Sequence, residues 1–141
     1  VVDYLQLVTA DAETRNLAVE SISRGLKALA KDLGVPVLAL SQLSRALEAR
    51  TDKRPILADL RDSGGIEQDA DVVLMLHREE GYRSDPGEWR GVAELLVRKN
   101  RQGPTGDVLL TWRAEHAAFE NFSGDRPSNV RPIRQSRGFD D

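Results

Sequence analysis

The chain has 141 residues, no cysteine and a formal net charge of -3, and 40% of its residues are hydrophobic while 30% are charged. These values fit one soluble globular domain or part of one. They exclude disulfides, cysteine-type zinc sites and the overall basic excess that usually marks a nucleic-acid-binding domain. No apolar run approaches the roughly 20 residues that span a bilayer, so we expect a cytoplasmic protein that does not contact membranes.

The chain opens with an apolar stretch, residues 1–7, that predicts a β-strand and contains a single carboxylate, Asp3. Burial of an unpaired carboxylate costs free energy, and a bound cation relieves that cost. Asp3 is therefore a candidate metal ligand. Alternatively, it caps a helix or pairs with a basic side chain.

Residues 12–33 carry apolar side chains at alternating spacings of three and four, which predicts an amphipathic helix that ends at Gly34. An unbroken apolar run, residues 37–40, predicts a strand buried on both faces. Strand, helix and strand form a right-handed unit whose strands are parallel. Ligands of such sheets bind at the carboxyl ends of the strands, and Ser41 and Gln42 lie at this end.

A charged stretch, residues 44–68, interrupts the apolar pattern. A connection of this length in a compact domain is usually either functional or disordered. Ile56, Leu57 and Leu60 predict one short helical turn inside it, and we expect Ile66 to anchor its end.

Three further strands are predicted in the second half of the chain, over residues 71–76, 92–99 and 107–113, and we expect the first of them to be buried. A Gly-Pro turn at residues 101–106 makes the last two an antiparallel hairpin. From residue 123 the chain is poor in apolar residues, so we expect a flexible tail. Because about five strands and one long helix cannot cover both faces of a mainly parallel sheet, we expect a preceding segment or a partner to cover the bare face.

Four stretches, taken in their order and spacing, point to a known family: residues 2–7, 41–45, 59–71 and 99–104. Together they resemble the bacterial replicative DNA helicase, the DnaB family, over residues 1–122. The resemblance implies an α/β fold with a RecA-like core of the P-loop NTPase type. It also implies a mainly parallel sheet, incomplete in this chain, with an antiparallel hairpin on its C-terminal side. The family uses ATP and Mg²⁺, forms a homo-hexameric ring and moves along single-stranded DNA to unwind duplex at the fork.

The resemblance assigns roles in a nucleotide site to four residues. Asp3 matches the acid that holds Mg²⁺ through water, and Gln42 matches the glutamine that senses the γ-phosphate. Lys99 and Arg101 match a basic pair that reaches the nucleotide of the neighbouring subunit, with Arg101 as the arginine finger. Phosphoryl transfer needs charge neutralisation on the γ-phosphate, and a positioned guanidinium supplies it.

Three more residues, Arg61, Asp62 and Gly64, match the loop that lines the central channel of the ring and holds the DNA backbone. A guanidinium suits a phosphate, and glycine lets backbone amides approach it closely. Because this loop has no aromatic side chain, phosphate contacts alone would make binding independent of base sequence. Alternatively, Arg61 and Arg101 are ordinary surface arginines.

The chain departs from the family in one respect. The phosphate-binding loop needs a Gly-Lys pair, and none of the 11 glycines is followed by lysine. We therefore expect residues 1–122 to be the C-terminal portion of a helicase motor domain, followed by a flexible tail over residues 123–141. We expect the isolated chain to lack ATPase and unwinding activity.

The expected partners are single-stranded DNA, further copies of the chain in a hexamer, primase and a helicase loader. Two other function classes stay open on the sequence. One is another RecA-like ATPase, of the recombinase or clock-protein type. The other is a non-enzymatic module that binds a helicase loader or primase.

Overall fold

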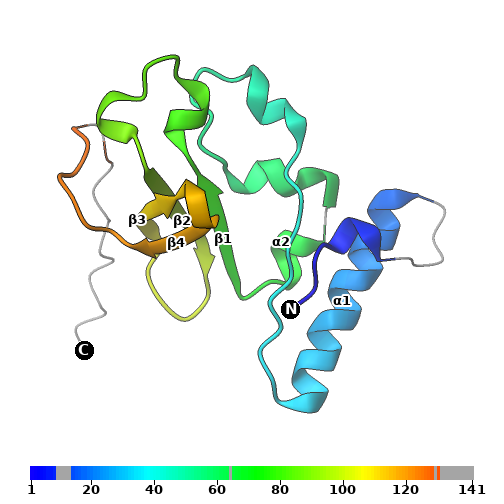
Figure 1. Cartoon of the computed structure of the whole chain (residues 1–141). Helices are drawn as coiled ribbons and strands as arrows, with labels where there is room; N and C mark the ends of the chain where they lie inside the picture. Colours follow the sequence, from blue (N-terminus) through cyan, green and yellow to red (C-terminus); the bar gives the residue numbers. More distant parts are fainter. Residues whose placement is uncertain (9–13, 64, 129, 131–141) are drawn as a thin grey trace, which may run out of the picture. The chain divides into compact units, whose positions relative to one another are not determined.

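The computed structural model describes residues 1–8, 14–63, 65–128 and 130 (Figure 1). The chain divides into two compact units, residues 1–70 and residues 71–141. The first unit contains the helices α1 and α2, and the second contains a four-stranded sheet.

Helix α1 spans Arg15–Leu33 and confirms the amphipathic helix that the apolar spacing predicts. The Thr14 hydroxyl accepts a hydrogen bond from the Leu17 amide (3.3 Å) and so caps the first turn. Gly34 ends the helix in the left-handed conformation (φ 63°), which glycine adopts without a Cβ clash. In the described part of the chain, no helix combines the length and hydrophobicity needed to cross a bilayer.

Two extended segments of the first unit run parallel and meet at a bridge between Val2 and Ala39. The Val2 amide donates to the Leu38 carbonyl (2.8 Å), and the Leu40 amide donates to the Val2 carbonyl (2.9 Å). Parallel pairing is thus confirmed, although it is confined to this bridge, and a 3₁₀ helix, η1 (Leu5–Leu7), follows. Leu38 and Leu40 are 56% and 42% exposed. The prediction of a strand buried on both faces is therefore wrong here, because such burial needs a layer on each side.

The charged stretch after these segments is more regular than expected. It contains the 3₁₀ helices η2 (Arg45–Ala49) and η3 (Leu57–Ser63) and the short helix α2 (Ile66–Asp69). Leu60 and Ile66 are both buried, which confirms Ile66 as an anchor.

The sheet of the second unit has the strand order β1-β2-β3-β4, and each strand is antiparallel to the next. The strands are β1 (Val72–His77), β2 (Val92–Asn100), β3 (Gly106–Arg113) and β4 (Ala118–Asn121). The predicted hairpin is confirmed as β2 and β3, whereas β4 was not predicted. In the described residues the parallel pairing lies in the first unit, and the antiparallel part extends beyond the hairpin to β1 and β4.

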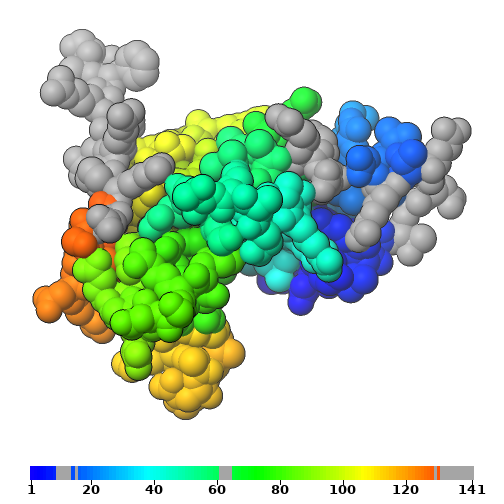
Figure 2. Space-filling model, turned by 90° about the horizontal axis from the view of Figure 1, so that it is seen from above, coloured from blue at the N-terminus to red at the C-terminus, as the bar shows by residue number. Residues whose placement is uncertain are grey.

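Three 3₁₀ helices connect these strands. They are η4 (Glu79–Tyr82), η5 (Gly87–Trp89) and η6 (Ala114–His116). The segment around η6, gold in Figure 2, stands out from the surface as a separate lobe.

Strand β1 is half buried rather than fully buried. Val73, Met75 and His77 alternate with residues that are exposed, and Leu74 and Leu76 are 50% and 51% exposed. Such alternation is typical of a sheet with one covered face. The prediction of a bare apolar face is therefore confirmed for this strand.

The covered side of the sheet has a compact apolar cluster. Trp89, Val92 and Leu109 are buried together, and Phe122 and Val130 pack against them. The segment expected to be a flexible tail thus begins with residues in contact with the sheet. Residue 129 and residues 131–141 lie outside the described part.

Candidate functional site

Asp3 and Gln42 lie at the same edge of the parallel pair in the first unit. Asp3 follows Val2 directly, and Gln42 comes three residues after Ala39, the bridge partner of Val2. Both residues are exposed. Because the carboxyl ends of parallel strands meet at one edge, the predicted metal acid and phosphate sensor stand where ligands of such sheets bind.

Gln6 holds this edge together, and the sequence analysis did not single it out. Its Oε1 accepts a hydrogen bond from the Gln42 amide (3.2 Å), and its Nε2 donates to the Gln42 carbonyl (3.3 Å) and to the Ser41 hydroxyl (3.0 Å). The side-chain amide thus pairs with the backbone as a neighbouring strand would. The signal that could have identified it is a polar residue inside an apolar stretch.

The groups present at this edge fit a magnesium ion that is held largely by a nucleotide. Asp3 supplies one exposed carboxylate. Among the described residues, no cluster of three or more His, Cys, Asp or Glu side chains could hold a metal by itself. Mg²⁺ typically keeps several waters and binds through one or two carboxylates plus phosphates, so a single acid at an open edge suits it.

Lys99 and Arg101 lie at the end of β2 and in the turn that follows it. A β-bulge shifts the register here, because Val73 pairs with Lys99 while Leu74 pairs with Val97. Bulges bend a strand and re-aim its side chains. Without the extra residue, Lys99 and Arg101 would have the opposite phase along the strand.

The Arg101 side chain is 51% exposed rather than packed into the core. Its amide donates to the Asp71 carbonyl (3.0 Å), and its Nη1 lies 3.6 Å from Asp71 Oδ1. Lys99 and Arg101 thus lie near the end of β2 in the second unit, and Asp3 and Gln42 lie at one edge of the parallel pair in the first.

A buried carboxylate, Asp59, organises the charged stretch that leads to the predicted DNA loop. Its Oδ2 accepts hydrogen bonds from Arg50 Nη2 (2.8 Å) and from the Ile56 amide (2.8 Å). Its carbonyl accepts one from the Ser44 amide (2.9 Å). One residue thus ties together three points of the stretch, and the sequence analysis did not identify it.

The predicted DNA-binding residues fall where the description of the chain stops. Gly64 lies outside the described residues, as do the side chains of Arg61 and Asp62, whose backbone belongs to η3. On the far side of the loop, Gly65 approaches α1 closely. A Cβ there would come within 2.6 Å of Glu20 Cγ.

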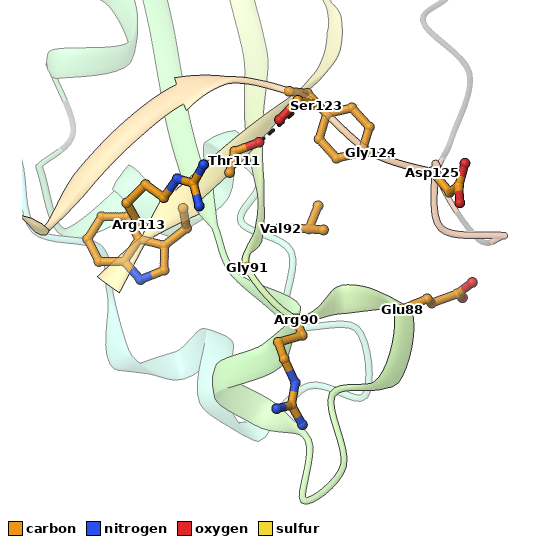
Figure 3. Close-up of a pocket in the computed structure, with 11 residues that line it drawn as sticks. Glu88, Arg90, Gly91, Val92, Thr111, Arg113, Ser123, Gly124 and Asp125 are labelled. Atoms are coloured by element: carbon orange, nitrogen blue, oxygen red, sulfur yellow. Dashed lines mark hydrogen bonds between the residues drawn. The ribbon is translucent and has the colours of Figure 1, made fainter. Parts of the chain in front are cut away.

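A pocket of about 330 Å³ opens in the second unit, next to Val92 and Thr111 (Figure 3). The Ser123 amide donates to Thr111 Oγ1 (3.2 Å) at its side. None of the residues predicted to contact nucleotide or DNA lines this pocket. The candidate site is therefore the edge with Asp3 and Gln42 together with the turn that contains Arg101, and not this pocket.

Glu88, at the rim of the pocket, binds the C-terminal segment. Its carboxylate accepts hydrogen bonds from the Ser128 hydroxyl (2.8 Å) and the Ser128 amide (3.1 Å). These bonds, the hydroxyl first, hold the pKa of Glu88 below its ordinary value.

Comparison with known proteins gives consistent results along nearly the whole chain. Residues 1–121 match the family described as DnaB-like helicase C terminal domain. The chain is 52% identical over 128 residues to the replicative DNA helicase DnaB of Pasteurella multocida, covering 89% of this chain and 27% of that protein. For Buchnera aphidicola from Acyrthosiphon pisum the identity is 50%, covering 89% and 28%. The chain therefore spans about a quarter of the length of these relatives.

Solved structures agree with the sequence matches. One, described as an ATPase domain, superposes with a TM-score of 0.81 at 43% identity and covers 86% of this chain and 43% of its own. Another, described as a DnaB-like replicative helicase and its interactions with primase, has the same TM-score and identity and covers 86% and 30%. At this identity the likeness extends beyond the fold to the family.

Proposed function

The chain belongs to the family of DnaB-like helicase C-terminal domains, and on this basis we propose that it is the C-terminal part of a replicative helicase motor. The full-length protein would couple ATP hydrolysis to movement along single-stranded DNA and to unwinding of the fork. Residues 1–122 form the motor part, and residues 123–141 form a tail. The isolated chain has no turnover, because it lacks the Gly-Lys phosphate loop.

The first unit contributes the acid and the sensor of one nucleotide site. Asp3 would hold Mg²⁺ through water, and the metal would neutralise charge on the phosphates of ATP. Gln42 would contact the γ-phosphate. The three hydrogen bonds between Gln6 and residues 41 and 42 support this role, because they hold the segment that contains the sensor.

The second unit contributes the finger to the site of the next subunit. Charge develops on the γ-phosphate oxygens during transfer, and a guanidinium placed there stabilises it. Arg101 would supply that guanidinium, and Lys99 would add a second positive charge. The observation that carries the proposal is the half-exposed Arg101 side chain in a turn anchored to β1.

DNA binding is assigned to the loop of Arg61, Asp62 and Gly64. Hydrogen bonds to Asp59 hold the charged stretch that precedes this loop, which supports a well-ordered start of the loop. A ring of copies would place these loops around one strand, and phosphate contacts would make binding independent of base sequence. We also propose a homo-hexamer, primase and a helicase loader as partners, and a cytoplasmic location.

Complementation between two inactive variants of the full-length protein tests the trans arrangement. Arg101→Ala should lower kcat by about 10³-fold or more, because it removes the finger. Asp3→Asn should abolish turnover through the metal site. In coexpressed mixed rings, Arg101→Ala subunits have an intact Asp3, and Asp3→Asn subunits have an intact Arg101. About a quarter of the interfaces then combine both intact groups, so activity should return.

Arg90→Ala is the matched control, because Arg90 is another exposed arginine of the second unit. It should leave kcat and complementation unchanged. Mixed rings that stay as inactive as either parent would show that Asp3 and Arg101 act within one subunit, and the proposal would be wrong.

A further inference from the structure

Arg101 makes two separate contacts with Asp71. The Asp71 carbonyl accepts from the Arg101 amide (3.0 Å), and the Asp71 carboxylate lies 3.6 Å from the guanidinium. The backbone contact continues the β1–β2 ladder beyond the pair of Val72 and Asn100. This backbone bond anchors the base of the turn. The Asp71 carboxylate can therefore act only on the direction of the Arg101 side chain.

The rest of the turn is braced by Asn100. Its Oδ1 accepts from the Gln102 amide (3.2 Å), and its Nδ2 donates to the Pro104 carbonyl (3.3 Å). A Cβ on Gly103 would come within 2.8 Å of Asn100 Nδ2, so the side chain fills the inside of the turn. The backbone around Arg101 is therefore fixed independently of Asp71's side chain.

Across the hairpin, Arg98 Nη1 contacts Asp107 Oδ1 at 2.5 Å. This pair is largely buried, with side-chain exposures of 21% and 8%. The Asp71–Arg101 pair differs from it, because both side chains are more than half exposed. An exposed pair is weak and exchanges its partner readily. A weak ion pair with Asp71 can thus restrict the position of the Arg101 guanidinium and still release it to a phosphate.

We propose that Asp71 is a positioning residue for Arg101, which its carboxylate keeps oriented for the nucleotide of the neighbouring subunit. This inference rests on the proposed function. A long arginine side chain has many rotamers, and a contact that limits them raises the fraction of time spent near the reacting phosphate. The effect appears in kcat, because Asp71 itself touches no nucleotide.

The size of the effect follows from the exposure of the pair. Exposed pairs contribute little, so Asp71→Asn should lower kcat by about two- to fivefold with KM for ATP unchanged. Asp71→Glu, which keeps the charge, should restore part of the loss. Asp85→Asn is the matched control, because the carboxylate of Asp85 accepts from the Gly87 amide and lies on an exposed turn. It should leave kcat unchanged.

The mixed rings of the full-length protein separate positioning from a general structural role. The Asp3→Asn subunit contains the intact Arg101. Asp71→Asn introduced into this subunit should therefore lower the restored activity by the same two- to fivefold. Placed on the Arg101→Ala subunit, it has no finger to orient and should change nothing. Ring assembly, followed by size-exclusion chromatography, should be equal in both arrangements.

Each outcome has a distinct meaning. An equal loss of activity from both placements, or no loss from either, would overturn the role of Asp71 while leaving the trans finger intact. Absence of any restored activity in the parent mixture would instead overturn the proposed function, and the inference with it.

Discussion

Replacement of Asp59 should loosen the stretch that precedes the predicted DNA loop. Asp59 is 7% exposed at its side chain and accepts two hydrogen bonds there, from Arg50 Nη2 and the Ile56 amide, both at 2.8 Å. Asp59→Ala removes both hydrogen bonds at once, because Oδ2 accepts the two. The Arg50 guanidinium also donates to the Arg54 carbonyl (3.1 Å), so part of its contacts survive.

Hydrogen bonds that involve a charged group contribute about 1.5–3 kcal/mol each, and an unpaired buried partner adds to the loss. Arg50 is 31% exposed and can regain water, which reduces its share. We therefore expect Asp59→Ala to lower the free energy of local opening by about 2–4 kcal/mol. Asp59→Asn keeps the acceptor for Ile56 but loses the charge, so about half of that loss is expected.

Amide hydrogen exchange on the full-length protein measures this opening directly. A loss of about 3 kcal/mol corresponds to a roughly 10²-fold faster exchange, confined to residues 44–63. Asp52→Ala is the control, because Asp52 is a half-exposed carboxylate of the same stretch that accepts from the Arg54 amide. Unchanged exchange in residues 44–63 of Asp59→Ala would refute the assignment of Asp59 as the organising residue.

Two further predictions concern the contact between Glu88 and Ser128 and the glycines of α1 and its C-cap. Ser128→Ala should raise the pKa of Glu88 toward its ordinary value, because the Ser128 hydroxyl bond is the main cause of the lowering, and a carboxyl NMR titration measures it. Since folding lowers this pKa, the contribution to stability is present above the unfolded value and is lost as pH falls through the folded value. Ser128→Ala should weaken that dependence, because the Ser128 amide bond remains. Gly34→Ala should cost about 1 kcal/mol at its φ of 63°, whereas Gly25→Ala, inside α1 with open space around it, should gain about 0.5–1 kcal/mol in denaturant unfolding.

Local patterns in the sequence were sufficient for elements that depend on near neighbours. The spacing of apolar residues and Gly34 predicted α1, and the Gly-Pro turn predicted the β2–β3 hairpin. Strand β4 was missed because Ala118–Asn121 alternates weakly and is defined by its pairing with β3. Pairing of this kind is a property of the partner strand as much as of the segment itself.

Burial was predicted less well, and the reason is physical. Residues 37–40 have the composition of a strand covered on both faces, yet Leu38 and Leu40 are exposed. Leu74 and Leu76 show the same mismatch on β1. The composition of a strand reflects the surroundings in which it evolved. This chain matches only about a quarter of the length of its relatives. Exposed apolar side chains of this kind typically mark contact surfaces.

In the candidate site, sequence motifs and burial point to different residues. Asp3, Gln42 and Arg101 are all exposed, and a search for buried polar groups would have found Asp59, His77 and Glu94 instead. A site shared between subunits requires this pattern, because each half must present its groups to a ligand held partly by another chain. Gln6 contacts the backbone of Gln42 through its side-chain amide, and Asp71 is proposed to orient Arg101 through its carboxylate. No spacing rule encodes either contact. Sequence motifs thus predict which groups meet the ligand, and the fold is needed to propose which groups orient them.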